Sequence, residues 1–513
     1  MKMVSVGRKL LLVSVAASVL ASCGGGADDI ASPGEGTLIG LAPPPAATTP
    51  PPTTTPTGPA ASCPTGTTDA GVIANRRNCR LPSRIATSLS LPKVAGTFFS
   101  IDGRTDVGTD VGGDGAAAGG QSAILSIDPG VIVIGQSQAS FLVVNRGSQI
   151  NAVGTVAAPI IFTSLANLEG TATDGSSNQW GGVYMLGRAP ISNCNAAVTG
   201  GTAQCQQQAE GTNAPALYGG ANAADNSGQL RYVQIRFTGF SLAANAELQG
   251  LTTGGVGSGT RIENIHIHNS GDDGVEIFGG THNLKNLVVT GADDDGIDTD
   301  FGYKGFMQFV IAIQRPQSLG TNGDTMIEAD SNPEVVGADD FIPRQNTRLS
   351  NFTFIQTRTG TRAIHLRGGT DYALLNGVVV SPSACLDVDQ ATTVQAADPA
   401  KDEAGPPIIR SVLFACTPFA DTDPDDFETQ ALNAAGNTNN INPFTPTLTS
   451  LFVNGTAEAA AVPFNASLIN PFFVSTNYVG AVRDASDTWY RGWTCDSGYA
   501  AFGSNNSCNT VPA

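Results

Sequence analysis

An apolar triplet that returns at a nearly regular interval is the feature that most restricts the fold of this chain. Each copy has apolar residues or glycine at its positions 1, 4 and 6, as in Leu230-x-x-Val233-x-Ile235. The copies begin at Leu230, Ile262, Leu284, Phe306, Leu349 and Leu374, at intervals of 32, 22, 22, 43 and 25 residues. A period near 22, with Gly, Asn and Asp between the copies, predicts stacked coils of a parallel β-helix. Residues 314–348 are rich in Pro, Gly, Asn and Asp, so we interpret the longest interval as one coil with an inserted loop.

Each coil is expected to contain a second short strand after a polar turn. These segments are GVEIF from Gly274, GIDTD from Gly296, MIEAD from Met326, AIHLR from Ala363 and CLDVD from Cys385. Side chains alternate along a strand, so the residues predicted to point inward are Ile277, Thr299, Ala329, Leu366 and Val388. A β-sandwich is the competing fold, but its turns would recur every ~8 to 12 residues.

The first 22 residues predict export and lipid attachment. Basic residues precede an apolar run from Leu10 to Leu20, which is typical of a secretory signal and too short to span a bilayer permanently. The run ends in LASC, which resembles the lipobox of bacterial lipoproteins. This resemblance implies cleavage before Cys23, a lipid on its thiol and, with Gly24 next, release to the outer membrane. An ordinary signal peptide followed by an unrelated cysteine is the alternative.

Composition divides the rest of the chain. Residues 23–68 are rich in Pro, Thr and Gly and predict a disordered, polyproline-like tether of up to roughly 120 Å. We assign residues 69–407 to the β-helix and 408–513 to a last coil and an irregular C-terminal cap, which a solenoid needs because its open end is an unpaired edge. Within the cap, Asp423 before Pro424 predicts a helix through about Ala434.

The cysteines agree with export. There are nine, and the eight that remain after Cys23 fall as close neighbours along the chain. The simplest of the roughly 105 possible connectivities pairs these neighbours. The predicted disulfides are Cys63–Cys79, Cys194–Cys205, Cys385–Cys416 and Cys495–Cys508. Thiolate metal sites, the alternative, usually have tighter C-x-x-C spacing.

Several segments resemble a family of bacterial right-handed β-helix lipoproteins in the pectate-lyase-like superfamily. They are residues 124–164, QWGGVYMLGRAPI from Gln179, DDDGIDTD from Asp293 and NYVGAVRDASDTWYRGWT from Asn477. The resemblance implies an all-β, right-handed parallel β-helix on an outer-membrane lipoprotein that faces the periplasm or the cell surface. It implies no single activity, because the superfamily includes pectate lyases, polygalacturonases and non-catalytic adhesins.

Acidic residues are expected to form two columns on the outer face of the second strands. One column is Glu276, Asp298, Glu328, His365 and Asp387, and the other is Phe278, Asp300, Asp330, Arg367 and Asp389. Adjacent rungs lie about 4.8 Å apart, so these acids repel one another unless some are protonated, paired with Arg367 or bridged by a cation. A solvated acidic face is the alternative, and the turn acids Asp272, Asp273, Asp293, Asp294 and Asp295 have a simpler use in turn hydrogen bonds.

The sequence therefore predicts a functional surface on these strands. The predicted ligand-binding residues are Glu276, Asp298, Asp300, Glu328, Asp330, His365 and Arg367. The residues predicted to hold Ca²⁺, which prefers several hard oxygen ligands, are Asp294, Asp295, Asp298, Asp300, Glu328 and Asp330. Two nearby histidines, His266 and His268, are expected to be surface residues, and Trp489, Tyr490 and Trp493 are expected to pack in the cap.

Three functions follow as hypotheses. The first is a lipoprotein that binds a glycan or another envelope ligand, with an outer-membrane transporter as a candidate partner by family analogy alone. The second is a polysaccharide lyase or glycoside hydrolase with Asp298, Asp300 and Arg367 as candidate catalytic residues, although the hydrolase motifs Gly-His-Gly and Arg-Ile-Lys are absent. The third is a structural or adhesive envelope protein. A formal charge of −18 argues against nucleic acid as a partner.

Overall fold

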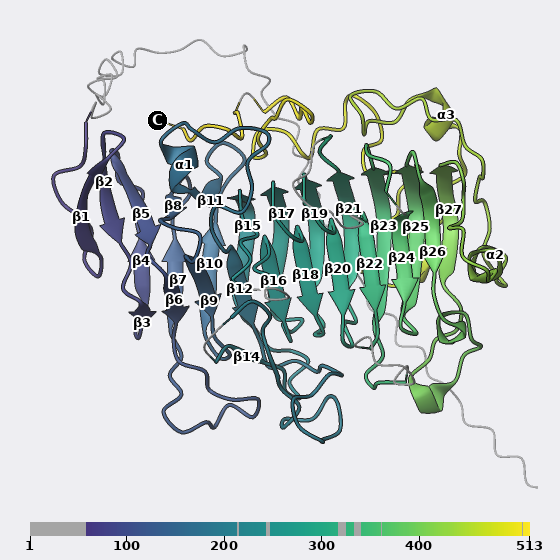
Figure 1. Ribbon diagram of the computed structural model, residues 1–513, viewed down its shortest axis with the longest axis horizontal. Coiled ribbons are helices and arrows are strands. Elements are labelled where there is room, and N and C mark those ends of the chain that lie inside the picture. Colours follow the sequence, from purple (N-terminus) through teal and green to yellow (C-terminus); the bar gives the residue numbers. More distant parts are fainter. Residues whose placement is uncertain are drawn as a thin grey trace, which may run out of the picture. The chain divides into compact units, whose positions relative to one another are not determined.

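Figure 1 shows the computed structural model, in which short strands stack side by side along one axis. The structure describes residues 58–512, apart from 213–214, 243–246, 317–324, 333–339, 361 and 505. These residues belong to one compact unit, Thr55–Ala513. The predicted signal peptide, Cys23 and most of the predicted tether lie outside the described residues. Within the described residues, no helix is long and apolar enough to cross a membrane.

The strands form two long sheets and one small hairpin. Sheet A contains β1 (Thr68–Ile73), β2 (Arg76–Arg80), β4 (Leu89–Leu91), β5 (Thr97–Ile101), β7 (Ile124–Ile127), β8 (Ile132–Gly135), β10 (Gln149–Val153), β11 (Ile160–Ser164), β15 (Gly228–Arg236), β17 (Arg261–His268), β19 (Asn283–Thr290), β21 (Phe306–Ile313), β23 (Asn346–Ile355), β25 (Asp371–Val380) and β27 (Ile408–Ala415). Sheet B contains β3 (Arg84–Ile85), β6 (Arg104–Val107), β9 (Phe141–Val144), β12 (Val183–Leu186), β16 (Leu251–Gly254), β18 (Val275–Phe278), β20 (Ile297–Asp300), β22 (Ile327–Asp330), β24 (Arg362–Arg367) and β26 (Ala384–Val388). The hairpin pairs β13 (Gln207–Gln208) with β14 (Leu217–Tyr218). The helices are α1 (Leu165–Leu168), α2 (Phe427–Leu432), α3 (Thr456–Ala459) and the 3₁₀ turns η1 (Ala391–Thr393), η2 (Pro399–Lys401) and η3 (Ala466–Leu468).

Neighbouring strands within sheets A and B are parallel, apart from β1 and β2, so the chain forms the predicted right-handed parallel β-helix. The predicted second strands are β18, β20, β22, β24 and β26, in neighbouring positions of sheet B. Their inward residues, from Ile277 to Val388, are buried as the alternation required. The apolar interior is continuous from Cys79 to Cys416.

A stack of left-handed residues explains the spacing of the apolar triplet. Asn264, Asn286, Asn351 and Asn376 have φ angles of 57°, 58°, 57° and 54°. Each stands at position 3 of its triplet and bends the strand, so the inward positions fall at 1, 4 and 6 rather than at every second residue. Asparagine tolerates this conformation better than most residues. In the last of these coils, Gly377 occupies position 4, where a Cβ would lie 2.0 Å from the ring of Phe352.

The register differs from the prediction in one coil. Leu284 pairs with Met307 rather than with Phe306. The left-handed residue of this coil is Phe309, with φ 61°. The inward residues are therefore Met307, Val310 and Ala312, and Phe306 lies half-buried on the outer face. Such a shift by one residue exchanges the two faces of a strand. The true interval here is 23 residues, one more than the regular period suggested.

All four predicted disulfides are present, with Cα–Cα distances between 4.8 and 5.5 Å. The predicted helix at Asp423 is wrong in its start. Helix α2 begins at Phe427, whose backbone N–H donates to Asp425 Oδ1 at 3.1 Å, and Asp423 lies in the preceding bend. The Asp-Pro pair shapes the loop before the helix instead of its first turn.

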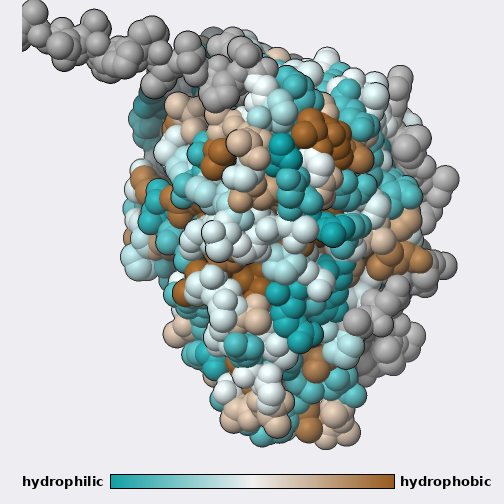
Figure 2. All heavy atoms as spheres, turned by 90° about the vertical axis from the view of Figure 1, so that its left-hand side faces the viewer, coloured by the Kyte–Doolittle hydropathy of each residue, from teal (hydrophilic) through white to brown (hydrophobic). Residues whose placement is uncertain are grey.

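The C-terminal residues run back along the outer face of sheet A. Figure 1 shows them in yellow, reaching toward the coils that contain the first strands. We call residues 489–512 the C-terminal strap. Tyr490 and Trp493 pack with Val288 and Ile311 of sheet A, so these aromatic residues are packing residues, as predicted. The end of the solenoid near β1 presents a mixture of hydrophilic and hydrophobic residues (Figure 2).

The prediction that His266 and His268 are surface residues is wrong. Both side chains are 0% exposed. Their strand face points outward, as the alternation indicated, but the strap covers it. A local pattern cannot show this, because the covering residues follow more than 220 positions later, as the contact between His266 and Cys495 shows, with a sequence separation of 229.

Candidate functional site: an acidic face on sheet B

The predicted acidic columns lie on the outer face of sheet B. In the first column, register pairs join Glu276 to Asp298, Asp298 to Glu328, Glu328 to His365 and His365 to Asp387. In the second, Phe278 pairs with Asp300 and Asp330 with Arg367. The fold therefore brings together the predicted ligand-binding residues on four neighbouring strands, β18, β20, β22 and β24.

The face is largely buried, which contradicts the alternative of a solvated acidic surface. Glu276, Asp300 and Asp330 are 4%, 8% and 5% exposed. One cover is the insertion of residues 187–227 between β12 and β15. Its Ser192 backbone N–H donates to the carbonyl oxygen of Phe301, and its Tyr218 ring stacks on Phe278 with centroids 5.6 Å apart.

The part of the face on and beside β22, β24 and β26 offsets most of its own negative charge. Arg367 Nε lies 2.7 Å from Glu328 Oε1 and 3.3 Å from Asp330 Oδ2. His365 Nε2 lies 2.9 Å from Asp389 Oδ2, and Arg362 Nε lies 3.2 Å from Asp387 Oδ2. We call this cluster of four acids and three basic groups the balanced half.

These contacts set the protonation of the balanced half. Burial opposes ionisation of Glu328, but hydrogen bonds with His365 and Asp295 and the charge of Arg367 bring its pKa to about 2. Burial disfavours the charged form of His365, yet its bonds with Asp389 and Glu328 raise the imidazole pKa. Glu328 and His365 thus form an internal ion pair, which leaves little demand for an external cation here.

The other part of the face has no such compensation. We call it the uncompensated half, and its acids are Asp272, Asp273, Glu276, Asp294, Asp295, Asp298 and Asp300. Within the described residues, none of these seven acids is in an ion pair; Arg367 attracts Asp298 and Asp300 only from its place beside Glu328.

Burial, reinforced by mutual repulsion, raises the pKa of every acid in the uncompensated half. The pKa of Asp272 rises to about 8 and that of Asp294 to about 6. The pKa values of Glu276, Asp298 and Asp300 lie well above their usual range, with burial as the main cause. Such a site holds protons, or it holds a cation that replaces them.

Among the residues that the structure describes, two buried carboxylate oxygens in this half have no hydrogen-bond donor as partner: Glu276 Oε2 and Asp298 Oδ1. Ligand atoms of Asp273, Glu276 and Asp298 lie within 4.8 Å of one another. A buried carboxylate oxygen without a partner is costly. Several oxygen donors from neighbouring strands fit Ca²⁺, which accepts loose coordination by six to eight oxygens, better than Zn²⁺.

The turn acids have a structural use as well. Asp273 Oδ1 accepts a hydrogen bond from the backbone N–H of Asp295 at 2.9 Å, and Asp295 Oδ1 accepts one from the N–H of Thr325 at 2.7 Å. These bonds join the turns of successive coils, in agreement with the simpler use that the sequence suggested. Asp294 is half-buried in the same turn as Asp295.

Sequence reasoning missed Glu210 and Arg362 as members of the face. The carboxyl of Glu210 faces Glu276, and burial raises its pKa. Glu210 belongs to the insertion, outside the repeating coils, so no periodic signal marks it. Arg362 lies on β24 three residues before His365, an odd offset that strict alternation assigns to the opposite face, so the strand pattern does not indicate it either.

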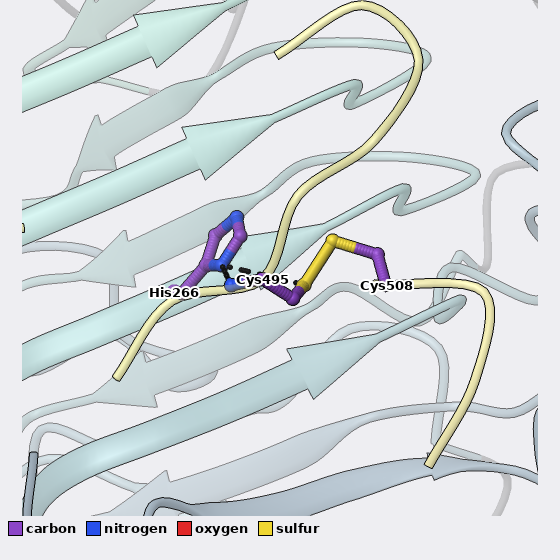
Figure 3. A group of neighbouring side chains, drawn as sticks. All are labelled: His266, Cys495 and Cys508. Atoms are coloured by element: carbon purple, nitrogen blue, oxygen red, sulfur yellow. Dashed lines mark hydrogen bonds between the residues drawn. A yellow bond between two sulfur atoms is a disulfide. The ribbon is translucent and has the colours of Figure 1, made fainter. Parts of the chain in front are cut away.

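A second group of potential ligands is not a metal site. His266, Cys495 and Cys508 lie close together (Figure 3). The two cysteines form a disulfide, so neither offers a thiolate.

Comparison with protein families supports this architecture. Residues 114–494 match the model of the pectate-lyase like beta helix domain. The chain belongs to this family. Comparison with curated proteins and with solved structures gave no match. The matched residues include the strands that carry the acidic face, the insertion and the beginning of the strap, but a fold of this kind does not define an activity.

Proposed function

We propose that the uncompensated half of the acidic face holds a divalent cation, with Ca²⁺ as the best fit, and that this face binds a polar ligand such as a glycan. The observation that carries the proposal is the pair of buried oxygens, Glu276 Oε2 and Asp298 Oδ1, for which the described part of the chain provides no hydrogen-bond donor. A cation would supply the missing partner and offset the repulsion among the neighbouring acids.

The proposal places the cation ligands nearer to β18 than the sequence suggested. Glu328 and Asp330 already contact Arg367, so they are weaker candidates than Asp273, Glu276 and Asp298. Asp300 and Asp294 are close enough to add to the negative potential, since Asp300 raises the pKa of Asp298.

The second part of the proposal concerns location. The LASC sequence supports a lipid on Cys23, which would attach the β-helix to the outer membrane through the Pro- and Thr-rich segment. A glycan or another envelope component would then be the accessible ligand, and a transporter in the same membrane a candidate partner.

A polysaccharide lyase or glycoside hydrolase is the second candidate function. It is favoured by the opposite pKa shifts of Asp298 and Glu328. Burial is the main cause that raises the pKa of Asp298. At Glu328, burial acts in the same direction, but the bonds with His365 and Asp295 and the charge of Arg367 outweigh it and lower the pKa. Two neighbouring carboxyl groups with separated pKa values suit an acid and a base. Release of reducing ends or of unsaturated sugars from a polysaccharide panel tests this candidate.

Calorimetric titration of the metal-free, Cys23→Ala full-length chain with Ca²⁺ and Mg²⁺ tests the main proposal. Binding of Ca²⁺ should be lost in the double variant Glu276→Gln, Asp298→Asn. The control Glu263→Gln removes an acid of sheet A that lies outside the face, and it should bind like the parent. A glycan array with and without chelator then tests the ligand. No Ca²⁺ binding and no glycan binding would favour a structural or adhesive protein.

A further inference from the structure

The C-terminal strap is held to sheet A by polar side chains that bind its backbone. Gln234 Nε2 donates to the carbonyl oxygen of Trp493 at 2.6 Å. Arg236 Nη1 donates to the carbonyl oxygens of Cys508 and Thr510 at 2.9 and 2.8 Å. These donors lie on β15 at the outer face of the sheet. Side chains of one strand therefore hold the strap through its backbone carbonyl groups, in the way that they could hold a separate peptide.

The two histidines under the strap are part of one hydrogen-bonded chain. The backbone N–H of Cys495 donates to His266 Nδ1 at 3.3 Å (Figure 3). This bond requires that Nδ1 carry no proton, so Nε2–H of His266 donates to Thr290 Oγ1 at 3.1 Å. The same Thr290 oxygen lies 2.8 Å from His268 Nδ1, and its hydroxyl donates to the carbonyl oxygen of Ile267 at 3.4 Å. The contact between the strap and His266 therefore exists only while Nδ1 of that imidazole carries no proton.

Protonation would turn the contact between strap and sheet from attractive to repulsive. A proton on His266 Nδ1 would oppose the N–H of Cys495, so the strap contact would be lost. His268 already has a buried Nε2 without a hydrogen-bond partner among the described residues. An added charge on either ring would be buried with no partner, which is unfavourable.

The groups that face these rings offer no compensation. Burial is the main cause of the lowered pKa of both imidazoles. Arg236 of β15 lowers both further, and His266 and Arg315, which follows β21, lower that of His268. From the strap, Tyr499 stacks on His268, Phe502 contacts His266, and the cysteine next to His266 is in a disulfide. Two carboxylates lie at the strap contact, and neither bonds a histidine. Asp174 accepts hydrogen bonds from the N–H of Gly498 and from Asn509, and Asp496 of the strap accepts them from the N–H groups of Phe502 and Ser504.

We propose that the C-terminal strap is a pH-dependent latch, which closes on sheet A while His266 and His268 are neutral and opens when they take up protons. Opening would uncover Gln234, Arg236 and the apolar residues Val288 and Ile311. The latch is separate from the acidic face, since it lies on the other sheet.

The sign of the effect follows from linkage. Both histidines have a pKa below the usual value in the closed state, that of His266 being about 3, because burial disfavours the charged form. The open state regains an ordinary imidazole pKa near 6.5. The opening equilibrium should thus be flat above pH ~7 and grow by up to about tenfold per pH unit for each histidine below ~6.5.

Hydrogen exchange of the full-length protein, read by mass spectrometry between pH 7.5 and 4.5, measures this opening. After correction for intrinsic exchange, peptides from residues 489–512 should lose protection as the pH falls, while peptides from β8 and β11 should not. The variant His266→Asn, His268→Asn keeps an acceptor oxygen near each Nδ1 position and should remove the pH dependence. His282→Gln changes a buried histidine of another contact, with Thr253, and serves as the matched control.

Two results would overturn the latch. One is strap protection in the parent protein that does not change over this pH range. The other is a pH response that survives in the double histidine variant or disappears in Asp174→Asn, because the carboxylate would then carry it. If the double variant fails to fold, as judged by circular dichroism, the parent and Asp174→Asn proteins still test the latch. It is overturned if protection in the parent does not change with pH, or if the pH response disappears in Asp174→Asn.

Discussion

Asp298 and Glu328 occupy the same register position on neighbouring strands, yet their carboxyl groups ionise in opposite ways. Burial raises the pKa of Asp298 well above its usual range, whereas contacts with His365, Asp295 and Arg367 outweigh burial at Glu328 and bring its pKa to about 2. The boundary between the two halves of the acidic face therefore lies between β20 and β22.

The first prediction concerns stability and pH in the absence of cations. Carboxyl groups whose folded pKa is raised, such as Asp272 at about 8 and Asp294 at about 6, stabilise the fold while protonated. Their contribution is complete below about pH 4 and is lost as the pH rises toward about 8. In chelator, the melting temperature should fall between pH 6.5 and 8, and Ca²⁺ should remove this fall. Calorimetry of the parent and of Glu276→Gln, Asp298→Asn checks it, since the variant should fall less in chelator.

The second prediction concerns Arg367. Replacement by Gln removes the Arg367 charge from Glu328 and Asp330 and leaves His365 as the basic group beside Glu328, so we expect a loss of about 1–3 kcal/mol in the free energy of unfolding. The double variant Arg367→Gln, Glu328→Gln should lose less than the sum of the single changes, because it removes both charges of the pair. Urea denaturation at one pH measures all the variants, and additive losses would contradict a coupled pair.

The third prediction compares two disulfides. The bond Cys385–Cys416 closes a separation of 31 residues and joins β26 to the end of β27, so its removal by alanine should cost about 2–4 kcal/mol. The bond Cys194–Cys205 closes only 11 residues within the insertion, and its removal should cost less. Equal losses in thermal unfolding would argue against the loop-length explanation.

The fourth prediction tests the packing of the solenoid interior. Gly377→Ala would place a Cβ 2.0 Å from the ring of Phe352, so we expect a destabilisation of about 1–3 kcal/mol. Shortening the partner in Gly377→Ala, Phe352→Leu should recover part of this loss relative to Phe352→Leu alone. A double variant that is as unstable as the sum of the two changes would show that backbone conformation, not the ring, requires glycine.

The fifth prediction concerns the proposed lipid. Cys23→Ala should move the protein from the membrane fraction to the soluble fraction, because acyl chains stabilise membrane attachment by burying methylene groups. Immunoblots after washing at high salt measure this distribution. A variant that stays with membranes would contradict anchoring through this cysteine.

The periodic part of the fold could be predicted because each coil repeats one pattern. The inward residues and the acidic register followed from strand alternation and a period near 22 residues. The register of β21 could not, because Phe309 takes the left-handed position that asparagine has in neighbouring coils, and nothing in its side chain indicates that conformation.

The burial of the site was hidden for a different reason. The residues that cover it come from segments with no repeat, such as the insertion that contains Glu210 and Tyr218. The strap covers His266 from far along the chain. Periodicity predicts which face a side chain takes, but not what lies over that face.

The C-terminal segment also changes how the solenoid can unfold. Phe444 packs against Leu413 of the last sheet A strand, and Val511 packs against Phe98 of β5. A stack of coils that contact only their neighbours can fray from either end. Here one C-terminal segment contacts coils near both ends of the solenoid. Loss of a terminal coil therefore also requires the release of contacts that this segment makes with other coils. Pulling on the ends should therefore give one large rupture force rather than a series of small ones.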